Sequence, residues 1–197
     1  MTDAWSECRA RLAVRAPDVL EAWNGFDWSL AGLKSLRRVL RRSVDSGSSA
    51  RILAQQEAVA DELAIILDAL PEASLRAPGG EADWNAAQAF AHATAARRFL
   101  VAWAAQDVDG TRPGDERRVI PSIPGPAHAT RDDLRTLLDK SRRSMARSAE
   151  QIAGHETERC AMDHPLIGHL RHGEWLCFVG VHDLMHLEQL HRLADGG

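Results

Sequence analysis

The sequence predicts an all-α protein, a four-helix bundle with an N-terminal helical extension. Four stretches of about 20 residues each carry apolar side chains at the helical spacing of i, i+3, i+4 and i+7. Strand signals are nearly absent, and residues 117–120 are the one short candidate. Helices with one apolar face must cover that face, and four such helices do so as a bundle. We expect the bundle over residues 50–197 and the extension over residues 1–49.

The extension is expected to contain short helices followed by a more basic one. Pro17 suits the first turn of a helix, where its missing N–H costs nothing, and Gly25 is expected to end that helix. The basic helix is predicted over residues 28–44, with arginines on one face. A basic face can contact nucleic acid, but we expect a solvated face here. Its apolar face is formed by Leu30, Leu33, Leu36, Val39 and Leu40.

The first two bundle helices are predicted over residues 50–70 and 84–106. Pro71 should end the first of them, and Asp83 is a candidate N-cap for the second. The inward line of the second helix is Gln88, His92, Ala95, Phe99 and Trp103. His92 is therefore predicted at a core-facing position.

Two loops flank the third bundle helix, which is predicted over residues 130–153 with Thr130 as its N-cap. Residues 107–128 contain four prolines and three glycines, and we expect a loop or an extended crossover there. Residues 154–172 are predicted to form a second loop, after which the last helix begins.

The last helix places two histidines inside its apolar stripe. His182 and His186 are four residues apart, so both imidazoles project from one face, one turn above the other. Buried imidazoles need partners for a donor and an acceptor, and a shared metal ion is one such partner. Hydrogen-bonded core histidines are the alternative. HDLMH lacks a glutamate after the first histidine, and Asp183 points about 100° away from His182, so no metalloprotease base is expected.

The remaining candidates are given lesser roles. Gln189, one turn beyond His186, is the better candidate for lining the site, while Asp183 and Glu188 are expected outside the ligand set. Cys177 is interpreted as a packing residue. A loop position is favoured over a second metal site for His164, His169 and His172, and His128 is expected to be exposed. His155 is expected at the negative end of the third helix, and His191 is expected to point away from the site.

Composition and charge narrow the partners and the location. The chain has 45% hydrophobic and 26% charged residues, as globular proteins do, and its net charge of −4 gives no basic field for nucleic acid. No apolar run could span a bilayer, and the first residues lack the apolar core of a signal peptide, so no membrane partner is expected. Three cysteines without CxxC spacing are typical of reduced thiols. We expect a cytoplasmic protein.

A motif over the second half of the chain resembles the DinB-like superfamily. It reads Trp84, His92, His164-Pro165, Gly168, Glu174-Trp175, His182-Asp183, His186 and Gln189-Leu190. The resemblance covers residues 50–194 and is most specific after residue 163. It implies a four-helix bundle, often dimeric, that binds a divalent metal through three histidines, here His92, His182 and His186.

The resemblance also suggests a chemistry. Family members include bacillithiol S-transferases and mycothiol-dependent maleylpyruvate isomerase, so it implies a low-molecular-weight thiol cosubstrate and a small electrophilic substrate. We expect zinc or nickel as the metal, although imidazoles also suit iron or copper, so the ligands alone do not decide which metal binds. Two function classes stay open: a metal-dependent thiol S-transferase or isomerase, and a non-enzymatic metal-binding or stress-response bundle. A homodimer is expected in either case.

Overall fold

The computed structural model describes residues 3–77, 84–111 and 123–194, and this part of the chain is mostly helical. The prediction of an all-α protein is confirmed. Within these ranges the helices are α1 (Ala4–Arg15), α2 (Pro17–Asn24), α3 (Leu30–Ser43), α4 (Ser49–Ala69), α5 (Glu72–Arg76), α6 (Ala86–Val108), α7 (Arg131–Ile152) and α8 (His172–Ala194). The described strands are β1 (Arg159–His164) and β2 (Gly168–Arg171).

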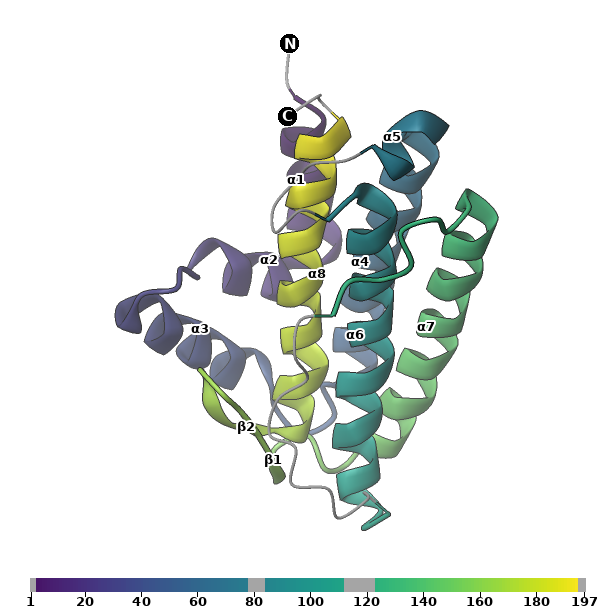
Figure 1. Cartoon of the computed structure of the whole chain (residues 1–197). Helices are drawn as coiled ribbons and strands as arrows, with labels where there is room; N and C mark the ends of the chain where they lie inside the picture. Colours follow the sequence, from purple (N-terminus) through teal and green to yellow (C-terminus); the bar gives the residue numbers. More distant parts are fainter. Residues whose placement is uncertain (1–2, 78–83, 112–122, 195–197) are drawn as a thin grey trace.

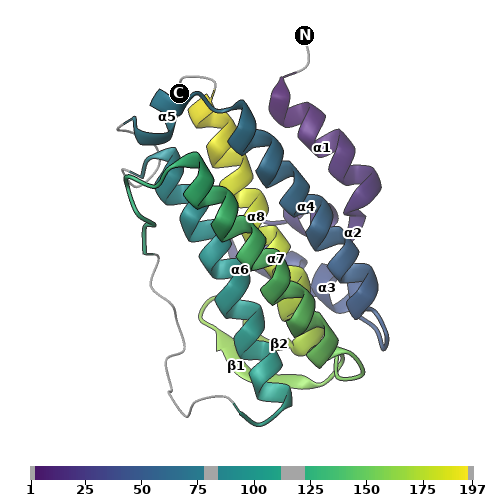
Figure 2. The same ribbon diagram turned by 90° about the vertical axis from the view of Figure 1, so that its right-hand side faces the viewer.

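Helices α4, α6, α7 and α8 form a four-helix bundle (Figure 1). Helix α6 packs against α7 and α8, and α4 packs against the same two helices, so α4 and α6 are diagonal to each other. The chain follows α4 and α8 in one direction and α6 and α7 in the other (Figures 1 and 2). Because α6 and α7 are parallel neighbours, the chain between them must return along the bundle. The bundle is therefore of the crossover type.

The helix boundaries follow local signals in the sequence. Thr130 caps α7 in a reciprocal capping box with Asp133, which confirms the predicted start of that helix. Helix α6 is capped by Asn85, whose side chain accepts the backbone N–H of Gln88, so the predicted cap was wrong by two residues. Asp83, the predicted cap, lies outside the described residues.

A β-hairpin replaces part of the loop predicted over residues 154–172, and that prediction was wrong. Strands β1 and β2 pair antiparallel, and Gly168 takes the positive φ of 79° at the start of β2. Cys160 and Met162 are buried on one face of β1, while Arg159 is exposed on the other. The alternation covers only a few residues, so it is weak in the sequence. The earlier strand candidate, residues 117–120, lies outside the described residues.

The N-terminal segment forms three helices that share the core of the bundle. Pro17 is the first residue of α2 and Gly25 is its C-cap, as predicted. Helix α1 packs on α4, and α2 and α3 pack on α8. At Gly180 of α8 an added Cβ would lie 2.7 Å from a methyl group of Val19, so only glycine permits this approach. The division of the chain at residue 49 stays a prediction.

Helix α8 is buried around most of its circumference, because α2, α3, α4, α6 and the hairpin surround it. The single apolar stripe predicted for this helix was therefore too narrow. Cys177 is fully buried among apolar side chains, as expected of a packing residue. Two other inward predictions were wrong: Leu30 is 70% exposed at the first turn of α3, and Phe99 is 46% exposed under Arg98 on α6.

Candidate metal centre

Three histidines converge where α6 and α8 pack against each other. The ring of His92, from α6, lies 5.3 Å from that of His182 and 4.9 Å from that of His186, measured between centroids. The two rings on α8 are 4.7 Å apart. One nitrogen from each ring lies within 4.8 Å of the others, so this group could hold a metal ion. The structure thus brings together the three residues that the sequence singled out.

Hydrogen bonds define which ring nitrogen of His92 and of His186 is available to bind a metal ion. Nδ1 of His92 lies 2.8 Å from the backbone oxygen of Ile123, and Nδ1 of His186 lies 2.9 Å from Oε1 of Gln189. Both partners are acceptors, so each Nδ1 carries the proton and each Nε2 keeps its lone pair. Histidine ligands of metals are commonly oriented in this way. The expectation that Gln189 lines the site agrees with this contact.

The acceptor for His92 is placed by the described end of the crossover. Gly125 donates its N–H to the backbone oxygen of Gln88 at 3.2 Å, which lays this segment directly on α6. A Cβ at Gly125 would collide with the side chain of Ala91. A glycine is therefore needed two residues after Ile123 for the carbonyl of Ile123 to reach His92.

The electrostatic surroundings favour neutral imidazoles. Burial, followed by repulsion from His182, lowers the pKa of His186 to about 3. The same two causes lower the pKa of His92, and the hydrogen bond with Ile123 opposes them. Neutral imidazole is the form that binds metal, so no proton has to be displaced from these two rings near neutral pH.

His182 lies next to the buried carboxylate of the neighbouring residue, Asp183. Nδ1 of His182 is buried without a hydrogen-bond partner among the described residues, and so is Oδ1 of Asp183. These two atoms are 4.0 Å apart. The carboxylate of Asp183 therefore lies close to His182, although Asp183 does not belong to the group of convergent ligands. A set of three convergent imidazoles fits a divalent transition metal.

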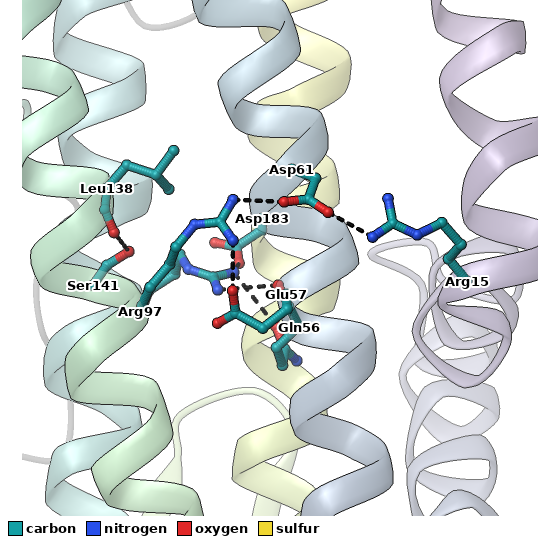
Figure 3. A network of polar contacts seen from close by, with 9 residues as sticks. Arg15, Gln56, Glu57, Asp61, Arg97, Leu138, Ser141 and Asp183 are labelled. Atoms are coloured by element: carbon teal, nitrogen blue, oxygen red, sulfur yellow. Dashed lines mark hydrogen bonds and ion pairs between the residues drawn. The ribbon is translucent and has the colours of Figure 1, made fainter.

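A buried ion pair holds the two histidine-bearing helices together. The guanidinium of Arg97, on α6, donates to Oδ2 of Asp183, on α8, and both side chains are fully buried (Figure 3). Arg97 also donates to the backbone oxygen of Gln56 on α4 at 3.2 Å. Gln56 in turn donates to the backbone oxygen of Leu176 at 2.7 Å. Three bundle helices are thus connected directly behind the histidines, an arrangement that the sequence analysis did not predict.

Aromatic side chains border the histidines on one side. The ring of Trp84 lies edge-on to His92, with centroids 4.9 Å apart, and stacks parallel to His186 at 6.5 Å. Trp84 precedes the cap of α6, so the start of this helix positions both the tryptophan and His92. His186 is buried, whereas Trp84, His92 and His182 remain partly exposed. The three-histidine group therefore lies near the surface of the bundle.

The histidines predicted in the second loop separate into different environments. His164 ends β1, and its ring lies 4.9 Å from that of Phe178. Its Nδ1 accepts the backbone N–H groups of Leu166 and Ile167, both at 3.2 Å. Burial and the charge of His182 lower the pKa of His164 to about 4. His164 thus lies on the same side of the molecule as the three-histidine group.

The other two histidines of that segment lie apart from His164. His169 on β2 pairs with Asp163, and His172 begins α8 beside Asp107. The three residues lie in β1, β2 and α8, so the loop position predicted for them was wrong, and they do not form one cluster of potential ligands among the described residues. His128 is exposed, as expected. His191 is buried against Trp5, with ring centroids 5.5 Å apart, and does not belong to the three-histidine group.

The fold and the site together define a class: helical bundles in which antiparallel core helices present three histidines that could hold a metal ion. The model of the DinB superfamily matches residues 55–190, and the chain belongs to this superfamily. Comparisons with curated proteins and with solved structures gave no match. None of the described helices is long and apolar enough to cross a membrane.

Proposed function

We propose that this protein is a divalent-metal-dependent enzyme that uses His92, His182 and His186 as its metal ligands. The observation that supports this most strongly is the convergence of three imidazoles, two of which have their protons directed away onto acceptors. Zinc and nickel are the metals we expect first. The reaction is the transfer of a low-molecular-weight thiol to a small electrophile, or an isomerisation that such a thiol assists.

The proposed chemistry divides between metal and protein. His92, His182 and His186 would hold the ion and leave a coordination position open, and a divalent ion bound there would favour the thiolate form of a thiol near neutral pH. A free thiol has a pKa near 8.5, so full deprotonation raises the thiolate population by roughly 30-fold at pH 7, about 2 kcal/mol. The thiolate sulfur bonds to the electrophilic carbon. Either a leaving group then departs, or the adduct rearranges and releases the thiol.

The side chains of the protein hold the ligands and the reactants. Gln189 and the carbonyl of Ile123 orient two ligand rings, and Arg97 fixes the spacing of α6 and α8. Trp84 supplies an apolar surface beside the site. Any acceleration beyond the thiolate population must come from holding both reactants in place. The homodimer and the cytoplasmic location expected from the sequence are part of the proposal.

The test is a conjugation assay with several low-molecular-weight thiols and a chloro-dinitrobenzene as electrophile. We expect turnover with metal-loaded protein and none above background with His186→Ala. His128→Ala is the matched control, because His128 is an exposed histidine outside the site. Absence of turnover with every thiol, in protein shown to carry a full metal complement, would favour the non-enzymatic metal-binding bundle.

A further inference from the structure

A second group of potential ligands lies at the opposite end of α6 from His92. It consists of Asp107 near the end of α6, Cys160 on β1 and His172 at the start of α8. Their ligand atoms also lie within 4.8 Å of one another. Cys160 is fully buried and His172 is 3% exposed. Residues 53 and 12 positions apart in the chain are therefore brought together by the packing of the hairpin on the bundle.

The carboxylate of Asp107 is the centre of this group. Its Oδ2 lies 3.0 Å from Nε2 of His172 and accepts the backbone N–H of Ala161 at 2.8 Å. The thiol of Cys160 also donates to this carboxylate. Burial acts to raise the pKa of Asp107, but these hydrogen bonds and the charge of His172 outweigh it and lower the pKa. The carboxylate is therefore ionised.

The ring of His172 faces an acceptor at each nitrogen. Nδ1 lies 3.3 Å from the backbone oxygen of His155, and a carbonyl oxygen can only accept. Nδ1 therefore carries a proton, and Nε2 faces an anionic carboxylate on its other side. Nε2 is therefore directed at the carboxylate of Asp107, 3.0 Å away, and toward the group of potential ligands. A ligand ring with Nδ1–H on a backbone carbonyl is the usual arrangement at metal sites.

We propose that Asp107, Cys160 and His172 form a second metal site, and that its metal is zinc. A thiolate, an imidazole and a carboxylate are all zinc ligands, and the thiolate excludes a preference for magnesium or calcium. Ligand atoms around tetrahedral zinc lie about 3.2–3.8 Å apart, so a small closure of the observed group suffices. The two anionic ligands balance the charge of the ion, which makes the site suited to a buried position.

This second site has a structural role. It connects the end of α6, the strand β1 and the start of α8, three segments that otherwise meet through hydrogen bonds. A thiolate and a carboxylate would neutralise the charge of the ion, so it would be a weaker Lewis acid than an ion held by three imidazoles. The proposal does not depend on the activity proposed for the three-histidine group.

The test uses cobalt as a spectroscopic substitute for zinc in the metal-free full-length protein. A thiolate bound to Co²⁺ gives a charge-transfer absorption in the near ultraviolet, which three histidines cannot produce. We expect this band to appear and, in the His186→Ala background, to saturate at one Co²⁺ per chain. Cys160→Ser should abolish it, whereas His186→Ala should retain it. Cys177→Ser is the matched control, since Cys177 is also a fully buried cysteine.

Further variants keep the test decisive if Cys160→Ser fails to fold. Asp107→Asn and His172→Gln both retain the thiol. Each should weaken the affinity of the second site for Co²⁺, measured from the thiolate band, by at least about 10-fold. In the His186→Ala background, zinc should still raise the melting temperature, and Asp107→Asn should remove that increase. The proposal is wrong if no thiolate band forms, or if the band persists in folded Cys160→Ser.

Discussion

The two ligand groups differ in the charge that they bring to a metal. The first consists of three imidazoles, two of them partly exposed, whereas the second contains a partly exposed carboxylate and a buried thiol. A divalent ion in the first group keeps its full charge and an open position. In the second, the proposed thiolate and carboxylate neutralise it. The same two helices, α6 and α8, can thus support a reactive centre at one level and a cross-link at another.

The largest expected effect concerns the ion pair behind the first group. Arg97→Met should lower the free energy of unfolding of the metal-free protein by about 3–5 kcal/mol, because it leaves the buried carboxylate of Asp183 without its partner. Urea denaturation measures this change.

The double variant Arg97→Met/Asp183→Leu provides the control, since it removes both charges. It should recover most of the lost stability. If the single variant costs less than about 1 kcal/mol, Arg97 is not the element that fixes α6 against α8.

The next effect separates the two groups by their metal affinity. His182→Ala should weaken zinc binding at the first site by more than about 100-fold, since even losing a group that orients a ligand costs about 10- to 100-fold. The cobalt–thiolate band of the second site should be unchanged. Competition with a chromophoric chelator measures the first affinity. Equal losses at both sites in His182→Ala would show that the groups do not bind independently.

The smallest effect tests His164, which shares the buried face of β1 with Cys160 but lies toward the first group. The folded-state pKa of about 4 lies below the ordinary value of 6.5, so the unfolded chain binds more protons between these values. Stability should therefore fall as the pH falls through this window. His164→Asn should flatten the decline by about 2 kcal/mol between pH 7 and pH 4.5.

Asparagine is a suitable replacement because its side-chain oxygen can accept the backbone N–H groups now bound by Nδ1 of His164. The measurement is the difference in urea-unfolding free energy between the two pH values, in wild type and variant. Parallel pH profiles would mean that His164 is already able to titrate freely in the folded protein.

The parts of the fold with strong local signals were predicted from the sequence. Thr130 with Asp133, and Pro17 with Gly25, define helix ends through their own backbone bonds, so a few residues suffice. The shared face of His182 and His186 was also predicted, because a spacing of four residues in a helix alone places both rings on one face. The position of His92 beside them depends on which helices are neighbours, and the family resemblance supplied that step.

The features that were missed depend on tertiary contacts. Arg97 and Arg98 are adjacent arginines, and nothing in the sequence distinguishes the fully buried one from its neighbour. The group around Asp107 draws one residue from each of three elements. Its one local signal was the alternation of Cys160 and Met162 with Arg159, Ala161 and Asp163, which could have indicated β1. Without that strand, the segment was interpreted as a loop.

The central position of α8 has a consequence for the order of synthesis. This helix follows every other described element in the chain, yet it supplies His182, His186 and His172. A nascent chain that lacks it offers only His92 of one group, and Asp107 with Cys160 of the other. Contacts such as that of Trp5 with His191 span nearly the whole sequence and form slowly. Metal binding by the complete ligand set of either proposed site therefore requires that α8 has already been translated.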